Sequence, residues 1–567
     1  GSVTPDISSP CEGSNNVVWT AVGGFGAGKV QYYRYVWKQS GTHTWTDTET
    51  KWSSGTIQTP PTSDGTWYLH VKGYNGADVG NGTYAYSVTV LPSPLTPTDD
   101  EAFVDGTSAI TWIWEDVSGE QGYRVKDAGG VDKSDDLSAN TIEWQETGLT
   151  ANTQYTRKIH SYNSCGESAG STGQSQWTLQ NTPTTPTFGT VTTNSIVLNT
   201  TGPLNLTAGD TGVYFDSTTA GGDGGINAWV QALTDTSTGL STNTQYTYQV
   251  MAQNAVGTDT AYSGTASKYT AIEPVAGLTF SGITTNSISV ASTNTPSNLI
   301  SGSSGLGFYR GTDSINSGWK KDNTPWVSSG LSPNTQYKFY ARTRNGDGET
   351  TDYCADHYEW TLSVPPGIGS VTPDISSPCE GSNNVVWTAV GGFGAGKVQY
   401  YRYVWKQSGT HTWTDTETKW SSGTIQTPPT SDGTWYLHVK GYNGADVGNG
   451  TYAYSVTVLP SPLTPTDDEA FVDGTSAITW IWEDVSGEQG YRVKDAGGVD
   501  KSDDLSANTI EWQETGLTAN TQYTRKIHSY NSCGESAGST GQSQWTLQNT
   551  PTTPTFGTVT TNSIVLN

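Results

Sequence analysis

The chain has 567 residues with 27 basic and 53 acidic side chains, which give a formal net charge of −26. This negative charge repels phosphate backbones and anionic lipid headgroups, so we expect neither nucleic acid nor a membrane surface as a partner. No apolar run approaches the roughly 18 residues of a membrane-spanning helix, and no membrane insertion within this chain is expected. Five cysteines and one methionine favour an oxidising location, extracellular or at the cell surface.

The sequence contains one long internal repeat. The residues from Gly369 onward are identical to those from Gly1 onward, and the identity continues to Asn567, which matches Asn199. The chain therefore holds one 368-residue repeat and the beginning of a second copy. Because a missed period misassigns a whole fold, this repeat governs the rest of the interpretation.

A shorter period subdivides the repeat. The motif Gly-Leu-x-x-Asn-Thr-Gln-Tyr begins at Gly148, Gly239 and Gly330, with successive starts 91 residues apart. An Asn-x-x-Gly turn stands eight residues beyond each of these tyrosines. Residues 65–75 resemble the same strand and turn in a more divergent form. Four similar modules therefore fill one repeat.

Short alternating apolar runs, such as 17–22, 110–114 and 246–250, are separated by Gly, Asn, Pro and Ser clusters every 8 to 12 residues or so. This spacing is typical of antiparallel β-sandwiches, so we expect an all-β fold, a linear tandem array of seven-stranded sandwiches. The expected modules are 1–91 (module 1, divergent), 92–181 (module 2), 182–273 (module 3), 274–366 (module 4), 367–459 (module 1 repeated), 460–549 (module 2 repeated) and 550–567 (the first two strands of module 3 repeated).

The repeated motif predicts a tyrosine corner. A leucine six residues before a tyrosine can cap the core from the connection between the two sheets, while the tyrosine hydroxyl bonds back to the backbone of that connection. The expected pairs are Leu149 with Tyr155, Leu240 with Tyr246, Leu331 with Tyr337 and Leu517 with Tyr523.

The stretch Leu331-Ser-Pro-Asn-Thr-Gln-Tyr337 resembles the L-x-P-x-T-x-Y stretch of fibronectin type III domains. Trp112 and Tyr123-Arg-Val125 resemble the second and third strands of that family. The chain is thus similar to tandem fibronectin type III or immunoglobulin-like modules of an extracellular microbial surface or filament protein. The resemblance implies a spacer or adhesion module and no chemistry.

Strand order predicts how the cysteines are used. In a seven-stranded sandwich the first turn of one module and the last inter-strand loop of the next module meet at one junction, so we expect Cys11 to pair with Cys165 and Cys379 with Cys533. Cys354 is then the odd cysteine of the repeat. It is either an inert, partly buried thiol or a lateral bridge to another chain.

No catalytic constellation is visible, and we expect no enzyme. The sequence lacks H-E-x-x-H, a cysteine pair at zinc spacing and a G-x-S-x-G elbow. No cofactor is expected either, although the carboxylates of Asp99, Asp100 and Glu101 leave open a calcium ion at a module junction.

Carbohydrate could be involved in two ways. Trp37, Trp45, Trp52 and Trp67 either stack on sugar rings of a surface glycan or pack the core of module 1, and core packing is the simpler interpretation. Sequons for N-glycans make a glycoprotein an expectation as well. The acceptor asparagines are Asn81, Asn199, Asn205 and Asn449.

The repetition itself indicates the function. We expect an extracellular structural or adhesive fibre, an adhesin-like filament that associates with itself or continues as a longer covalent array. The alternative is a set of accessory spacer or carbohydrate-binding modules of a secreted polysaccharide-degrading enzyme. Residues 551–567 repeat only two strands, and an isolated hairpin is marginal in water. Either a continuing polypeptide or a neighbouring chain, as in donor-strand assembly, is expected to complete them.

Overall fold

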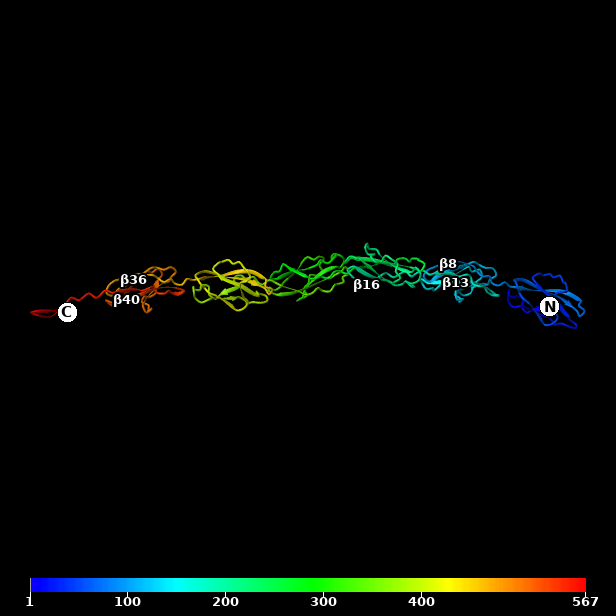
Figure 1. The fold of residues 1–567 in the computed structure, drawn as a ribbon, viewed down its shortest axis with the longest axis horizontal. Helices are drawn as coiled ribbons and strands as arrows, with labels where there is room; N and C mark the ends of the chain where they lie inside the picture. The colour runs from blue at the N-terminus through cyan, green and yellow to red at the C-terminus, as the bar shows by residue number, and fades with distance from the viewer. Residues whose placement is uncertain (1, 312) are drawn as a thin grey trace. The chain divides into compact units, whose positions relative to one another are not determined.

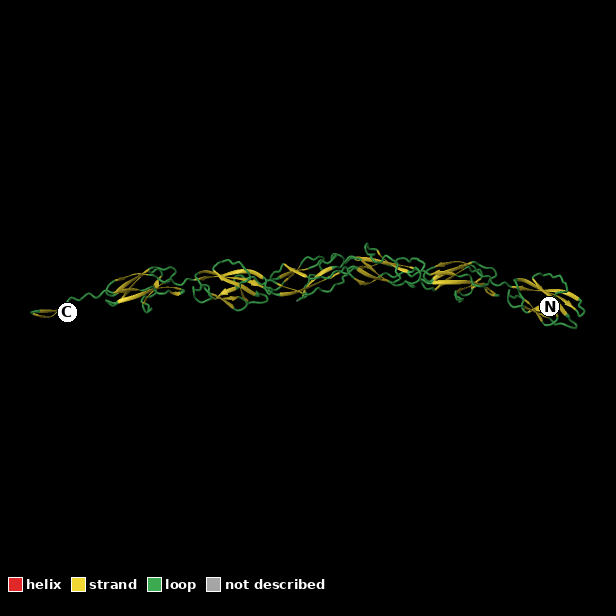
Figure 2. Cartoon of the chain, viewed as in Figure 1, coloured by secondary structure: helices red, strands yellow, loops and turns green. Residues whose placement is uncertain are grey.

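The computed structural model describes residues 2–311 and 313–567, and these form strands, turns and loops without any helix (Figure 2). Within the described residues, no helix is long and apolar enough to cross a membrane. Packing divides the chain into two bodies, which are described separately. The first runs up to Glu273 and also takes in Ile300–Ser304 and Arg344–Glu349, and the second comprises the remaining residues from Pro274 to Asn567.

Module 1 has two antiparallel sheets that enclose one core. Strands β1, β2 and β5 form one sheet, and the second has the order β4-β3-β6-β7. The strands are β1 (Val3–Pro5), β2 (Val17–Ala21), β3 (Tyr32–Lys38), β4 (Thr50–Trp52), β5 (Thr56–Thr59), β6 (Gly65–Tyr74) and β7 (Gly80–Val90). Alternate residues of β2 face the core, so Val17 and Trp19 are fully buried against Leu69 of the opposite sheet.

Module 2 repeats this arrangement with the sheets β12-β9-β8 and β11-β10-β13-β14, in which β15 also pairs with β13. Labels for β8 and β13 mark it in Figure 1. Its strands are β8 (Asp99–Val104), β9 (Ala109–Trp114), β10 (Gly122–Asp127), β11 (Leu137–Ser138), β12 (Glu143–Thr147), β13 (Gln154–Asn163), β14 (Gly166–Glu167) and β15 (Gln174–Trp177). Trp112 and Trp114 alternate inward along β9, and both pack in the core with Tyr123.

Modules 3 and 4 each have two three-stranded sheets. Their orders are β16-β17-β19 and β18-β20-β21 in module 3, and β22-β23-β25 and β24-β26-β27 in module 4. The strands are β16 (Thr187–Val191), β17 (Ser195–Asn199), β18 (Gly212–Ser217), β19 (Thr234–Thr238), β20 (Gln245–Gln253), β21 (Ala266–Tyr269), β22 (Leu278–Ser281), β23 (Ser287–Ser292), β24 (Gly305–Arg310), β25 (Trp326–Ser329), β26 (Gln336–Arg344) and β27 (His357–Trp360).

The expectation of seven strands agrees with module 1 but is wrong for module 2, whose described residues contain eight, and for modules 3 and 4, whose described residues contain six each. The missing strand is the counterpart of β11. In module 3 the segment between β18 and β19 carries four glycines, of which Gly221 and Gly225 adopt positive φ values of 78° and 82°. A strand requires negative φ, so this segment forms turns.

The second copy reproduces modules 1 and 2, here called modules 1′ and 2′. Module 1′ has sheets β28-β29-β32 and β31-β30-β33-β34, and module 2′ has β35-β36-β39 and β38-β37-β40-β41 with β42 on β40. Its strands are β28 (Val371–Pro373), β29 (Val385–Ala389), β30 (Tyr400–Lys406), β31 (Thr418–Trp420), β32 (Thr424–Thr427), β33 (Gly433–Tyr442), β34 (Gly448–Val458), β35 (Asp467–Val472), β36 (Ala477–Trp482), β37 (Gly490–Asp495), β38 (Leu505–Ser506), β39 (Glu511–Thr515), β40 (Gln522–Asn531), β41 (Gly534–Glu535) and β42 (Gln542–Trp545).

The chain ends in the hairpin β43 (Phe556–Thr560) and β44 (Ser563–Leu566), whose apolar side chains are exposed. Upstream of it, the fold is all-β, a tandem array of immunoglobulin-like, fibronectin type III-like sandwiches. Core clusters of modules 1, 2, 3, 1′ and 2′ each contain residues of that module only. Each of these five sandwiches is therefore a separately packed domain.

Candidate functional site at the module junctions

A disulfide joins module 1 to module 2. Cys11 is bonded to Cys165, with their Cα atoms 5.3 Å apart and a sequence separation of 154. Cys11 also lies beside the end of β7, where the N–H of Glu12 donates to the carbonyl of Leu91 at 2.9 Å. The first turn of module 1 is thus attached both to the linker and to the last loop of module 2.

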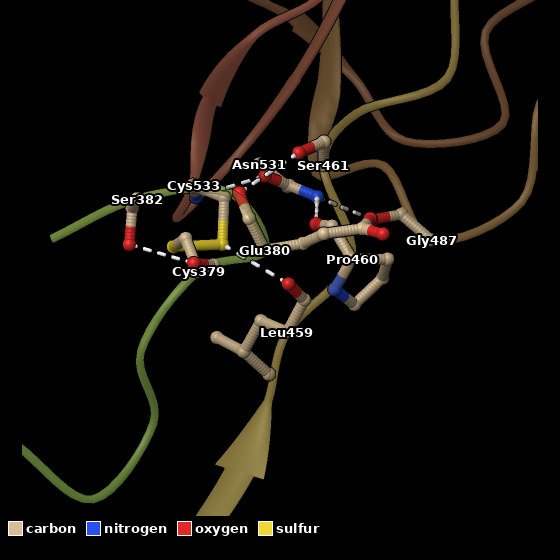
Figure 3. Close-up of a disulfide and its surroundings, with 9 residues drawn as sticks. All are labelled: Cys379, Glu380, Ser382, Leu459, Pro460, Ser461, Gly487, Asn531 and Cys533. Carbon is tan, nitrogen blue, oxygen red and sulfur yellow. Dashed lines mark hydrogen bonds between the residues drawn. A yellow bond between two sulfur atoms is a disulfide. The ribbon is translucent and has the colours of Figure 1, made fainter. Parts of the chain in front are cut away.

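The second body contains the same joint in modules 1′ and 2′ (Figure 3). Cys379 is bonded to Cys533 with the same Cα separation of 5.3 Å. The amide of Asn531 donates to the carbonyls of Pro460 at 3.1 Å and Gly487 at 3.3 Å, while its oxygen accepts from the Cys533 N–H at 2.8 Å. One asparagine therefore holds the cysteine loop against the linker.

Between modules 2 and 3 a buried asparagine replaces the disulfide. Asn152 is completely buried, and its amide donates to the carbonyl of Leu204 at 3.0 Å and to the hydroxyl of Thr211 at 2.8 Å. Its side-chain oxygen accepts from the N–H of Ala255 at 2.9 Å. A single side chain of module 2 thus satisfies both donors and acceptors of module 3.

Asn243 makes the equivalent contacts 91 residues later, again inside the first body. Its side-chain oxygen accepts from the Gly346 N–H at 2.9 Å and from the Ser304 hydroxyl at 3.0 Å. Close by, Lys268 forms ion pairs with Glu349 at 2.5 Å and with Asp347 at 3.2 Å. Burial opposes the charge of Lys268, but these two carboxylates raise the pKa of Lys268 above its ordinary value.

Asn334 makes the third such contact, inside the second body, between modules 4 and 1′. Its amide donates to the Gly394 carbonyl at 2.8 Å and to Gln399 at 3.1 Å, and its oxygen accepts from the Gly444 N–H at 2.8 Å. Asn334 is completely buried. We refer to Asn152, Asn243 and Asn334 with their partners as the asparagine clasps.

At each clasped joint, a second asparagine from the following module donates a hydrogen bond back to the preceding module. These asparagines, Asn254, Asn345 and Asn443, begin the turns after β20, β26 and β33, and each is only 1% exposed. Their amides donate to the carbonyls of Thr178 at 3.3 Å, Thr270 at 3.3 Å and Thr361 at 3.0 Å, respectively. Each joint is therefore reciprocal.

Backbone geometry explains why the clasp residue is asparagine. Asn152, Asn243 and Asn334 have φ values of 48°, 48° and 45°, in the left-handed region. Among residues other than glycine, asparagine tolerates this region best. Its amide also carries a donor and an acceptor on one short side chain. The sequence motif contains this asparagine at a 91-residue period, but the period alone did not show that its side chain forms hydrogen bonds with the next module.

The repeated motif also forms the expected tyrosine corners. The hydroxyls of the four motif tyrosines accept hydrogen bonds from the backbone N–H of the residue five positions earlier. The pairs are Tyr155 with Thr150 and Tyr246 with Ser241, both at 2.9 Å, and Tyr337 with Ser332 and Tyr523 with Thr518, both at 2.8 Å. The corner thereby fixes the connection from which the clasp asparagine projects.

The tryptophans of module 1 lie mainly in or beside its core. Trp52 is 2% exposed, and Trp37 stacks on Trp67 with ring centroids 5.3 Å apart. Trp45 packs edge-on against His43, with centroids 4.7 Å apart. Trp52 belongs to the core, and Trp37 and Trp67 pack against it, so the four rings do not form one open platform for a sugar.

The sequon asparagines differ in their surroundings. Asn205 donates to the Asn152 carbonyl at 3.0 Å, and Asn449 donates to the Ser363 carbonyl at 2.6 Å, so both side chains are engaged at junctions. Asn81 is exposed in the turn region at the start of β7, and Asn199 ends β17. An N-glycan on Asn205 or Asn449 would displace the adjoining module.

The remaining candidates lie within single modules. Asp99 accepts from the Thr172 hydroxyl at 2.9 Å and the Gly173 N–H at 2.7 Å, while the side chain of Asp100 lies outside the described residues and Glu101 is exposed. In the described part of the chain, no group of three or more histidine, cysteine or acidic side chains could hold a metal ion. Burial raises the pKa of the Cys354 thiol.

No protein-family model matches the chain. Among curated proteins, it is similar to Exoglucanase B of Cellulomonas fimi, with 27% identity over 420 residues. That similarity takes in 66% of this chain, which spans 36% of the length of the exoglucanase. Among solved structures, the chicken CNTN1 FN1-FN3 domains match over 48% of this chain and 98% of theirs, with 18% identity and a TM-score of 0.20.

Proposed function

We propose that the chain is a non-catalytic, extracellular structural array, a piece of an adhesive or load-bearing fibre whose joints are held in fixed geometries. The observation that carries this proposal is the chemistry of the joints. Modules 1 and 2, and likewise 1′ and 2′, are joined by disulfides, whereas modules 2 and 3, and modules 4 and 1′, are joined by asparagine clasps. A flexible spacer would need neither device, because glycine- and serine-rich linkers supply flexibility without ordered contacts.

Two further features support the proposal. Disulfides persist in oxidising compartments and are rare in the cytosol, which favours an extracellular location. A net charge of −26 opposes nonspecific association between chains that carry the same modules twice.

Small-angle X-ray scattering on the full chain tests the fixed joints. We expect one conformation to fit the scattering, and we expect the triple variant Asn152→Ala, Asn243→Ala, Asn334→Ala to require a broad ensemble while each sandwich still melts cooperatively. Scattering from the unaltered chain that only a freely jointed ensemble can fit would contradict the proposal. Electron microscopy of native material would test the fibre itself.

A second function has one specific observation in its favour, the similarity to Exoglucanase B. On this alternative the modules are accessory spacers or carbohydrate-binding domains of a polysaccharide-degrading enzyme. Co-sedimentation of the chain with insoluble cellulose tests the carbohydrate-binding form of this alternative. Saturable binding favours the accessory role, whereas recovery of all the protein in the supernatant excludes cellulose binding by these modules.

A further inference from the structure

One tryptophan of module 1′ differs from the others in the use of its indole N–H. The module has five tryptophans, and four of them donate this N–H to an oxygen of the same module. The fifth, Trp413, is partly exposed and donates to no acceptor in the described part of the chain. Trp45 is the same exception among the five tryptophans of module 1. These two indoles are therefore the ones whose donors remain available to a ligand.

Trp413 lines a hollow on the surface of module 1′. The hollow has a volume of about 360 Å³ and lies between the loop 407–417 and strand β34. The loop contributes His411 and Trp413, and the sheet contributes His438, Thr451 and Ala453. Ligand sites run from about 300 to 1,000 Å³, so this hollow suits one small ring-sized group.

The floor of the hollow lies where β33 and β34 pair. His438 of β33 stands directly opposite Ala453 of β34. The sequence neighbours of His438, Leu437 and Val439, belong to the core, so the histidine faces the other side of the sheet. Because Ala453 has only a methyl group, it leaves room beside the imidazole that a larger side chain would fill.

His438 supplies an acceptor at this floor. Its side chain is 95% buried, since the residue is 5% exposed, and Nε2 lies 2.8 Å from the carbonyl of Ser408. A carbonyl only accepts, so Nε2 carries the proton and donates. Burial, with the nearby His411 and Lys406, lowers the pKa of His438, so the ring is neutral near pH 7. Its Nδ1 then keeps a lone pair to which none of the described residues donates.

Hydrogen bonds hold the loop wall in place. Glu417 accepts from Nε2 of His411 at 2.9 Å and from the N–H of Thr414 at 2.8 Å, while Lys406 donates to Nδ1 of His411 at 2.8 Å. Trp413 packs edge-on against His411, with ring centroids 4.7 Å apart. The wall is therefore ordered before any ligand binds, which lowers the entropy cost of binding.

The lining indicates the chemistry of the ligand. It contains no Asp, Glu, Lys or Arg, which favours a neutral ligand. It combines an aromatic ring, an indole donor and an imidazole acceptor with the hydroxyl of Thr451, which makes no side-chain hydrogen bond to the residues that the structure describes. A sugar unit matches this set, because it has apolar C–H faces and hydroxyls that both donate and accept.

We propose that this hollow, and the identical site of module 1, each bind one neutral sugar unit of a glycan. The residues of module 1 make the same contacts, since Nε2 of His70 lies 2.8 Å from the Ser40 carbonyl and Trp45 packs against His43 with centroids 4.7 Å apart. The chain therefore carries two such sites, one for each copy of the module. The proposal goes beyond the structural array, because it names the class of ligand to which the array adheres.

NMR of the full chain, isotope-labelled at the tryptophan indole nitrogens, tests the proposal. The probes are the methyl glycosides of glucose, galactose, mannose and N-acetylglucosamine. We expect the indole signals of Trp45 and Trp413 to shift saturably with at least one probe, while the signal of the buried Trp420 stays in place. No shift of these two signals with any of the four probes would overturn the proposal.

Two pairs of variants locate the site. Trp45→Phe with Trp413→Phe keeps an aromatic ring, removes the indole donor and assigns the two signals. We expect sugar binding about three- to tenfold weaker for this pair, measured by saturation-transfer NMR of the sugar. Ala85→Leu with Ala453→Leu fills the hollow from the outer face of the sheet and should abolish binding. Binding that survives the filled hollow would contradict this site.

Thr89→Leu with Thr457→Leu is the matched control. These exposed threonines lie on the same strands and the same sheet face as the two alanines, four positions further on. The control should bind sugar as the unaltered chain does, and thermal melting checks that each variant remains folded. None of these results affects the scattering test of the fixed joints, so failure of sugar binding and failure of the fixed array can be distinguished.

Discussion

The side-chain oxygen of Asn334 accepts a hydrogen bond from the backbone N–H of Gly444, 2.8 Å away and 110 residues later in the sequence. This bond crosses from one sandwich to the next, and Asn152 makes the same contact with Ala255 across 103 residues. Buried polar groups that lose such a partner cost about 1–3 kcal/mol each. The joints are therefore part of the folding energetics of the modules they connect.

Replacing Asn152 should loosen the joint between modules 2 and 3. Asn152→Ala removes the acceptor for Ala255 and the donor to Leu204, and we expect a loss of about 1–3 kcal/mol in calorimetric unfolding, with faster proteolysis of residues 181–186. Asn520 is the matched control. It occupies the same place in the second copy with a φ of 51°, but its side chain is exposed.

Asn520→Ala should therefore lower the free energy of unfolding only by the strain of alanine in the left-handed region. If Asn152→Ala and Asn520→Ala destabilise the chain equally, the clasp adds nothing to stability. The variant Asn152→Gly, which relaxes the backbone and removes the side chain, should still lose the proteolytic protection of the linker.

Module 2 contains a buried ion pair whose loss should be costly. Arg157 donates to Glu146 at 2.8 and 2.5 Å, and the indole of Trp112 donates to the same carboxylate at 3.0 Å. We expect Glu146→Ala to destabilise module 2 by about 3–5 kcal/mol, because it leaves the Arg157 charge buried without a partner.

A paired replacement separates charge from packing. The double variant Glu146→Met, Arg157→Leu removes both charges at similar volume, and calorimetry should show a much smaller loss than for the single variant. A double variant as unstable as Glu146→Ala would show that packing, and not the uncompensated charge, dominates this site.

Acid should weaken module 1 through Glu49. Burial opposes ionisation of this carboxyl, but hydrogen bonds from the backbone N–H groups of Thr46 and Glu49, from the Thr46 hydroxyl and from His43 lower the pKa of Glu49 to about 2. Its folded pKa lies below the ordinary 4.5, so the resulting stability is complete above pH 4.5 and is lost as the pH falls toward 2.

We expect the melting temperature of module 1 to fall across this window, and the variant Glu49→Gln, with Glu417→Gln in the second copy, to be less stable near neutrality and less sensitive to acid. The pKa of Glu417 is likewise lowered to about 2. A variant whose melting temperature follows the same pH curve as the unaltered chain would exclude these carboxyls as the cause.

The alternation of apolar residues was sufficient to predict the sandwiches, because side chains of a strand alternate between core and solvent whatever the module contacts. The same alternation did not predict the hydrogen bonds that join one module to the next. Asn75 and Asn443 have identical neighbours in sequence, yet one is exposed and the other buried, because only module 1′ has the end of module 4 against it. No local pattern connects Asn334 to Gly444, since hydrogen bonds across 110 residues depend on the packed arrangement.

Cys354 should react slowly with thiol reagents. Burial raises the pKa of this thiol above its ordinary value, and its sulfur accepts a hydrogen bond from the N–H of Ala341 at 3.2 Å. The reactive thiolate is therefore scarce at pH 7. We expect iodoacetamide to label Cys354 far more slowly in the folded chain than in urea, as measured by mass spectrometry. Equal rates would indicate an accessible thiol suited to a lateral bridge.

The disulfides should limit how far the array can be stretched. Because Cys11 and Cys165 are 154 residues apart, most of modules 1 and 2 lies inside a closed loop that force along the chain cannot extend. In single-molecule pulling, the double variant Cys11→Ser, Cys165→Ser should gain about 550 Å of contour length, at roughly 3.6 Å per residue. The intact pair Cys379 and Cys533 is the internal control, and added reductant should release a second increment of the same size. In one 368-residue repeat, the intact disulfide therefore withholds 154 residues, about two fifths of the polypeptide, from extension by force. A double variant with the contour length of the unaltered chain would contradict this role.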